Sequence, residues 1–163
     1  MAFATTPTPG APVSSAEWHE TVEIHLVHDR TAAATARLAT RKILGGRLGW
    51  DEEYTYRALL VVSELVSNAV LHARPPVLLR LERFPTPDAR LRILVRDGGA
   101  DPAAHTIGHH EERGRGLIVV TTLSRKGGVD DGTGRDGMTS RWAELGPPSD
   151  PGRTGGREGW MTT

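Results

Sequence analysis

Two polar side chains inside an apolar stretch are the residues of this chain best suited to chemistry. Glu64 and Asn68 interrupt an aliphatic run from Ala58 to Ala73 that contains neither glycine nor proline. The run has helical spacing, which predicts a largely buried helix with Glu64 and Asn68 on one face. A carboxylate and an amide are costly in such surroundings unless something satisfies them. A divalent metal ion with phosphate oxygens and water would do so, because hard cations take oxygen ligands; a bonded Glu–Asn pair without ligand is the structural alternative.

A second candidate lies at the end of a predicted strand. Leu91 to Arg96 has a strand-like pattern that ends at Asp97, and two glycines, Gly98 and Gly99, follow it. A carboxylate placed there can accept a hydrogen bond while the glycine backbone approaches a flat ligand closely. An ordinary Asp-Gly turn would use the same residues.

A third candidate is the glycine pair Gly114 and Gly116, which opens an apolar stretch that predicts a helix from Gly114 to Ser124. Glycines before a helix N-terminus form an anion site, because free N–H groups and the positive end of the helix dipole face the phosphate. Arg115 would add a bidentate phosphate donor. Glycines also serve plain loops, and an exposed loop arginine is ordinary.

The order of these segments resembles the GHKL (histidine-kinase-like) ATPase superfamily. Within it, the sequences of residues 63–73 and 110–117 are similar to the corresponding motifs of the anti-sigma-factor serine/threonine kinases, also called switch-protein kinases. The resemblance covers about residues 22 to 145. It implies an α+β two-layer sandwich, with a mixed, mostly antiparallel sheet covered on one face by helices and ATP bound beneath a lid loop.

The resemblance also implies roles for named residues. Asn68 would bind Mg²⁺, Asp97 would accept from the adenine amine, and Glu64 would be the general base that takes a proton from a partner's serine or threonine hydroxyl. The implied nucleotide-contacting set is Asn68, Asp97, Gly99, Arg113, Gly114, Arg115, Gly116, Leu117 and Thr139. The implied partners are a sigma factor and a small anti-sigma-factor antagonist protein, with the kinase as a homodimer.

Two departures from the family pattern favour a rival function. Asp101 stands where the family usually has a second glycine, and the last strand leaves open whether Thr139 or Ser140 takes the adenine-contacting place. The rival is a non-catalytic ATP-binding module that acts by sequestration, whereas Glu64 favours the enzyme. A histidine kinase lacks support because no upstream helix pair with a phospho-acceptor histidine precedes the domain, and the chain is short for an ATP-driven machine.

Composition narrows the remaining classes. The 163 residues suffice for one domain with a core, and zero net charge disfavours nucleic-acid binding. The absence of cysteine excludes disulfides and thiolate metal sites and fits a reducing cytoplasm. No apolar run approaches the roughly 20 residues of a membrane span, and no secretory signal is visible. A zinc site at His105, His109 and His110 is disfavoured because no fourth ligand is evident.

The organisation predicted along the chain is one domain between two tails. Residues 1–18 form a disordered tail, 19–146 the ATP-binding domain and 147–163 a flexible tail. The expected elements are strands at 22–26, 77–84 and 91–96, a helix capped by Asp29 or Thr31 and ending near Leu44, a helix from Trp50 that contains Glu64, a lid over 100–112, the helix at 114–124, and a hairpin with Val129 and 141–145. Because strands do not alternate strictly with helices, an α+β fold is favoured.

Overall fold

A computed structural model describes residues 20–47, 52–84, 89–103, 112–130 and 137–146. The predicted tails therefore lie outside the described residues, and the domain limits stay a prediction. The elements in chain order are β1 (Glu20–Leu26), α1 (Ala32–Lys42), the π-helical segment η1 (Ile43–Arg47), α2 (Glu52–His72), β2 (Val77–Phe84), β3 (Arg90–Asp97), α3 (Glu112–Leu123), β4 (Lys126–Asp130) and β5 (Thr139–Leu145).

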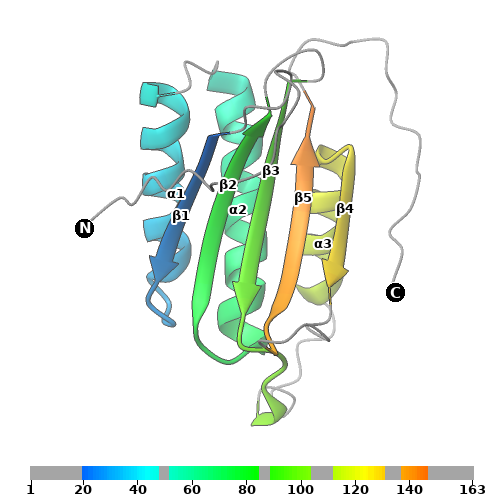
Figure 1. The fold of residues 1–163 in the computed structure, drawn as a ribbon. Helices are drawn as coiled ribbons and strands as arrows, with labels where there is room; N and C mark the ends of the chain where they lie inside the picture. Colours follow the sequence, from blue (N-terminus) through cyan, green and yellow to red (C-terminus); the bar gives the residue numbers. More distant parts are fainter. Residues whose placement is uncertain (1–19, 48–51, 85–88, 104–111, 131–136, 147–163) are drawn as a thin grey trace, which may run out of the picture.

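The strands form one sheet in the order β1-β2-β3-β5-β4, and the three helices lie on one face of it (Figure 1). The predicted α+β two-layer sandwich is confirmed. The sheet was expected to be mixed and mostly antiparallel, but each pairing between the described strands is antiparallel. The connectivity favours this arrangement. The pairs β2–β3 and β4–β5 are consecutive strands, which pair antiparallel when they are adjacent. The chain also enters β2 from α2 in the direction opposite to β1.

Alternation along the strands decides which side chains face the helices. In β3 the buried positions are every second residue and end at Asp97. Cross-strand partners share a face, and Asp97 pairs with Thr139 while Val95 pairs with Arg141. The helix-covered face of β5 therefore carries Thr139 and Arg141, and Ser140 lies on the uncovered face.

Helix α2 is the centre of the helical layer, where it packs against both α1 and α3 (Figure 1). Most of its apolar side chains are buried. At its N-terminal end the buried Tyr54 donates its hydroxyl hydrogen to the carbonyl of Leu145 in β5, at 2.8 Å. The Arg57 guanidinium donates to the carbonyl of Leu123 at the end of α3, at 3.1 Å. These bonds fix α2 to the sheet and to α3.

The C-terminal end of α2 is bonded to the chain that leaves β3. The Gly98 amide donates to the Arg74 carbonyl at 2.8 Å, and the Arg74 amide donates to the Gly99 carbonyl at 2.9 Å. The Asp101 amide then donates to the His72 carbonyl at 3.0 Å. The end of α2 and the end of β3 consequently form one hydrogen-bonded unit.

The first helix begins after Thr31, one of the two predicted caps, but its end differs from the prediction. Thr31 is the N-cap but makes no side-chain capping bond. Instead, the Asp29 carboxylate accepts hydrogen bonds from the hydroxyl and the amide of Thr31, which hold the pKa of Asp29 below its usual value. After Lys42 the helix does not stop but widens into η1, which keeps Ile43 and Leu44 buried in the core.

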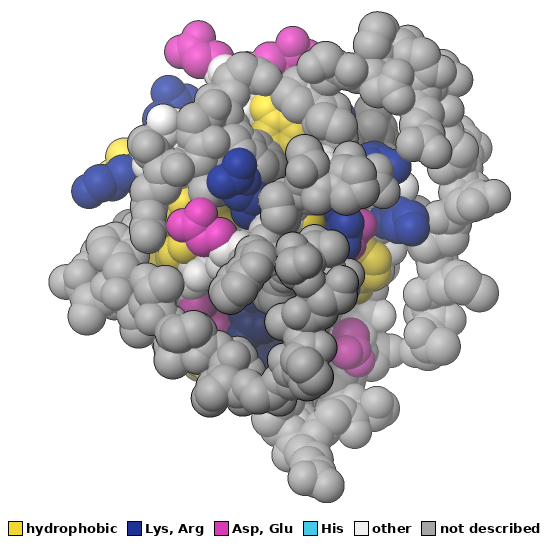
Figure 2. All heavy atoms as spheres, turned by 45° about the horizontal axis from the view of Figure 1, so that its top comes forward, with side chains coloured by type: hydrophobic (Ala, Val, Ile, Leu, Met, Phe, Trp, Pro, Cys, Tyr) yellow, Lys and Arg dark blue, Asp and Glu magenta, His cyan; other side chains and the backbone are white. Residues whose placement is uncertain are grey.

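The face of the molecule drawn in Figure 2 is mixed in charge. Seen toward the end that is uppermost in Figure 1, basic and acidic side chains lie among hydrophobic ones rather than in a region of one sign (Figure 2). None of the described helices combines the length and hydropathy needed to cross a membrane.

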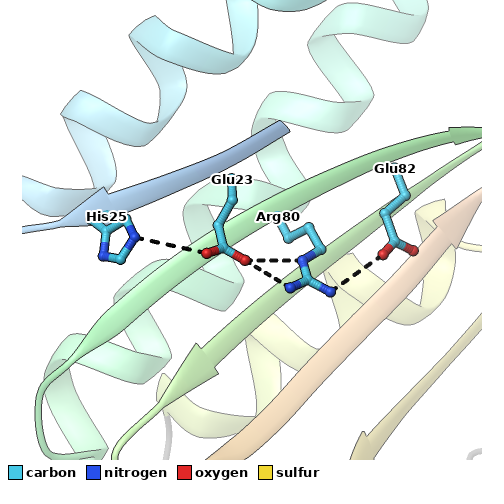
Figure 3. Close-up of polar contacts among 4 residues, drawn as sticks. All are labelled: Glu23, His25, Arg80 and Glu82. Carbon is cyan, nitrogen blue, oxygen red and sulfur yellow. Dashed lines mark hydrogen bonds and ion pairs between the residues drawn. The ribbon is translucent and has the colours of Figure 1, made fainter. Parts of the chain in front are cut away.

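The uncovered face of the sheet carries a small ion-pair network on β1 and β2 (Figure 3). Arg80 donates to one oxygen of Glu23, its partner across the strands, from Nε at 3.1 Å and from Nη2 at 2.8 Å. His25 and Glu82 lie 3.8 Å from this pair at either end. Such exposed pairs contribute about 0–1 kcal/mol, so the network makes this face polar without stabilising the fold greatly.

We predict that Gly98→Ala destabilises the protein by about 1–3 kcal/mol, a typical cost of overpacking. A Cβ at Gly98 would lie within 3.0 Å of the carbonyl oxygens of Arg74 and Pro75, and backbone cannot yield as a side chain can. Gly45→Ala is the matched control, because a Cβ there meets nothing within 4 Å. Its free energy of unfolding in urea should be unchanged or raised by up to about 1 kcal/mol. Equal destabilisation by the two substitutions would contradict the prediction.

Candidate nucleotide site

Helix α2 presents Glu64 and Asn68 on one partly buried face, as the sequence predicts. The residues beside them, Leu65, Val66 and Ala69, are buried. Within the described part of the chain no hydrogen bond joins Glu64 to Asn68. The two side chains therefore do not satisfy each other as a ligand-free pair would. The Asn68 amide oxygen remains suited to a hard cation, and the Glu64 carboxylate to a cation or a proton.

The Glu64 carboxylate lies directly against Gly116 of α3. A Cβ added to Gly116 would come within 3.0 Å of Oε2 of Glu64, a distance that real Cβ atoms essentially never show. Gly116 is buried and lies in the second turn of α3, near the helix end whose dipole attracts negative charge. Two segments that are far apart in the sequence thus meet at one point.

Helix α3 begins at Glu112, two residues before the predicted start at Gly114. Arg113, Gly114 and Arg115 therefore lie in the first turn of the helix, and the glycine pair is helical rather than a preceding loop; the side chains of these residues lie outside the described part. Glycine costs about 1 kcal/mol relative to alanine inside a helix. The contact with Glu64 accounts for the glycine at position 116, because a larger residue there would displace the Glu64 carboxylate. The amides of Glu112, Arg113 and Gly114, in the first turn of α3, have no acceptor within the helix and can bind an anion.

The neighbouring Leu117 also has a described position. Its side chain is exposed. It follows Gly116 on α3, so it lies one residue beyond the contact with Glu64. Whether Leu117 contacts a nucleotide stays a prediction from the family resemblance.

Asp97 is fully buried, with 0% of its surface exposed. Its Oδ1 accepts from the amide of Gly99 at 3.0 Å, and its Oδ2 accepts from the guanidinium of Arg141. The first of these bonds belongs to the Asp-Gly turn that was the simpler interpretation of the sequence. Gly99 has a φ of +81°, a conformation that favours glycine. The carboxylate is thus held in place by two donors from different strand ends.

The structure places Thr139 and Ser140 on opposite faces of the sheet. Thr139 is the cross-strand partner of Asp97, and its hydroxyl oxygen would lie 3.9 Å from a Cβ added to Gly99. Ser140 pairs with Arg96 and projects to the uncovered face. Of the two residues, Thr139 is therefore the one that lies with Asp97 and Gly99; its contact with adenine stays a prediction.

Arg141 is the member of this cluster that the sequence analysis missed. Its side chain is 27% exposed and reaches Asp97 from the adjacent strand. A signal was present, since residues two apart in a strand share a face. If Thr139 faces the helices, then Arg141 does too, and an arginine on a covered face needs a counter-ion such as a buried aspartate.

The predicted lid is described only at its start, residues 100–103, and at its last residue, Glu112. Asp101 is bonded there, because its Oδ1 accepts from the amide of Ala103 at 2.9 Å. Residues 104–111, which include His105, His109 and His110, lie outside the described part. Among the described residues no group of three metal-binding side chains comes together.

The fold and the cluster together define a class of protein. An antiparallel sheet backed by helices, with a carboxylate and an amide on the central helix, a helix N-terminus beside that carboxylate and a buried carboxylate at a strand end, is suited to hold a nucleotide and its metal ion. The chain matches the sequence model of the histidine kinase-like ATPase domain over residues 26–139. It belongs to this family.

Family membership supports a regulatory domain that binds ATP, usually with Mg²⁺, and that acts as an ATP-dependent kinase or ATPase. No curated protein sequence matches the chain at a significant level. The finer identity of the activity therefore depends on the residues of the site.

We predict an energetic coupling between Gly116 and Glu64. Gly116→Ala should gain helix propensity, about 1 kcal/mol, but must push the Glu64 carboxylate aside. In a Glu64→Ala background the obstacle is gone, so the same change should stabilise by at least about 0.5 kcal/mol more, as a double-mutant cycle in urea measures.

Glu53→Ala is the control background for this cycle. Glu53 is an exposed residue at the start of α2, and its effect should add to that of Gly116→Ala without coupling. Equal effects of Gly116→Ala in the wild-type and Glu64→Ala backgrounds would contradict the contact.

Proposed function

We propose that this protein is an ATP-dependent serine/threonine kinase of the anti-sigma-factor type. It phosphorylates a small antagonist protein, holds a sigma factor inactive and works as a cytoplasmic homodimer. The observation that carries the proposal is the position of the Glu64 carboxylate. It lies against Gly116 in the second turn of α3 and has no described hydrogen-bond partner. A carboxylate without a hydrogen bond to the described residues, beside a helix N-terminus, is suited to accept a proton during phosphoryl transfer.

The residues present fit a magnesium ion. The side chains on this face of α2 offer oxygen atoms, the amide oxygen of Asn68 and the carboxylate of Glu64 one turn earlier, and Mg²⁺ prefers oxygen ligands. Asn68 would hold the ion, which when bound neutralises charge on the phosphates.

The other residues position the reactants. Asp97 accepts a hydrogen bond from the adenine amine, with Gly99 and Thr139 beside the ring. The free amides at the start of α3 bind the phosphates. Glu64 takes the proton of the partner's hydroxyl as that oxygen bonds to the γ-phosphorus and the bond from that phosphorus to the β-phosphate oxygen breaks, so that the products are a phosphorylated protein and ADP.

The alternative is an ATP-binding module that regulates by sequestration and transfers no phosphate. Asp101, which stands where the family usually has a second glycine, favours it. The position of Glu64 supports the kinase, since a nucleotide binder without catalysis needs no general base.

We predict that Asn68→Ala weakens binding of ATP at least about tenfold when Mg²⁺ is present, and little when the metal is chelated, because the lost group is a metal ligand. Ser67→Ala is the control, a change at the adjacent, partly buried position on another face of α2. Calorimetry with and without Mg²⁺ measures both. Asp97→Asn should weaken binding in either condition. The metal role would be wrong if Asn68→Ala lost the same affinity with and without Mg²⁺.

We predict that Glu64→Gln still binds ATP but transfers phosphate about 10²–10⁴ times more slowly, the usual cost of removing a general base. Glu53→Gln, on the same helix but exposed, should transfer at the wild-type rate. The assay mixes labelled ATP with candidate antagonist proteins encoded next to this chain.

Two outcomes of this assay decide between the kinase and the sequestration module. A Glu64→Gln protein as fast as the wild type would end the base assignment. A wild-type protein that bound ATP and a sigma factor, yet phosphorylated no antagonist, would establish the sequestration module instead.

A further inference from the structure

We propose that Arg141 competes with the nucleotide base for the carboxylate of Asp97 and thereby sets the affinity and the base preference of the site. The inference rests on the proposed role of Asp97 as the acceptor for the base. It concerns a residue outside the set that the family resemblance implies. Arg141 acts here as a specificity-determining residue, not as a catalytic one.

The burial of Asp97 carries the first step. None of its surface is exposed, and both of its oxygens are engaged, Oδ1 by the amide of Gly99 and Oδ2 by Arg141. Because Asp97 has no exposed surface, a base amine can reach Oδ2 only if a covering group moves, and the guanidinium of Arg141 is the described group bonded to this oxygen. The bond to Gly99 is made within the turn and can stay, so that binding exchanges one donor on Oδ2 for another.

The setting of Arg141 makes this exchange feasible. Its side chain is 27% exposed, so the guanidinium can recover water when it leaves Asp97. Among the described residues its polar contact is with Asp97 alone. The backbone at Arg141 is held in β5 opposite Val95, so only the side chain has to move.

The chemistry of the base gives the exchange its selectivity. The amine of adenine is a donor and can replace the guanidinium on Oδ2. Hypoxanthine has a carbonyl oxygen at the same ring position, which repels a carboxylate but accepts from a guanidinium. Arg141 therefore hinders an adenine nucleotide and assists a 6-oxo purine, so that removing its guanidinium sharpens the preference for ATP over ITP.

The test measures the affinities of ATP and ITP by calorimetry for the wild type, Arg141→Met and Arg96→Met. Methionine keeps an unbranched side chain without donors. Arg96, in β3, is on the uncovered face opposite Ser140, so its substitution removes the same charge away from Asp97. We expect Arg141→Met to bind ATP about tenfold more tightly, the value of one hydrogen bond to a charged group, and to bind ITP no more tightly than the wild type does. Arg96→Met should show neither change.

A second readout follows from the loss of the ion pair. Without nucleotide, Arg141→Met should melt at a lower temperature than the wild type, because Asp97 loses its partner. Saturating ATP should then raise its melting temperature by more than it raises that of the wild type. Arg141→Lys, which keeps a positive charge without the planar fork of donors, serves if the methionine variant does not fold. It should show a smaller gain in ATP affinity of the same sign.

Each result decides the matter. An Arg141→Met protein, or an Arg141→Lys protein if the first does not fold, that binds ATP no more tightly than the wild type overturns this inference alone. An equal gain for ATP and ITP also overturns it. If the wild type and all variants bind neither nucleotide, the proposed function fails as well.

Discussion

Helix α2 has to bury itself against the sheet, α1 and α3 at once, and the rest of the structure depends on that requirement. Its long apolar surface supplies much of the core, and burial of such surface drives folding. Hydrogen bonds then fix both of its ends, at Tyr54 and around Arg74. With its rotation and height set in this way, the helix has little freedom left. The packing of their neighbours places Glu64 and Asn68, and neither side chain makes a hydrogen bond to the described residues.

The two halves of the candidate nucleotide site are held by different means. The half assigned to the phosphates is made by helix packing, where the α2 carboxylate meets the α3 backbone at Gly116. The half assigned to the base is made by strand pairing, where the register of β3 and β5 sets Asp97 beside Thr139 and near Arg141. The bonds from Arg74 to Gly98 and Gly99 connect the halves. A ligand that spans both halves therefore meets a frame whose dimensions the core has already set.

Local sequence signals predicted most of the fold and part of the site. The bounds of β2 could be predicted because prolines at 75, 76 and 85 flank a run of strand-forming residues. The start of α3 could not, because two glycines weaken the helical signal and the reason for Gly116 lies on another helix. The π-helical extension of α1 depends on the burial of Leu44, which only the tertiary structure defines. Arg141 was missed although its spacing from Thr139 is a signal, because its partner Asp97 lies 44 positions away in the sequence.

The contact of Gly116 with Glu64 also bears on how related sequences can diverge. Because a methyl group at position 116 would displace the carboxylate of Glu64 from its present position, the residue types at the two positions should depend on one another. A protein without a carboxylate at position 64 no longer needs glycine at position 116, and alanine there would stabilise helix α3. If Glu64 is the general base, as proposed, relatives that do not transfer phosphate should differ at position 116 as well as at position 64. The covariation of these two positions would distinguish enzymes from binding modules among chains that share the fold.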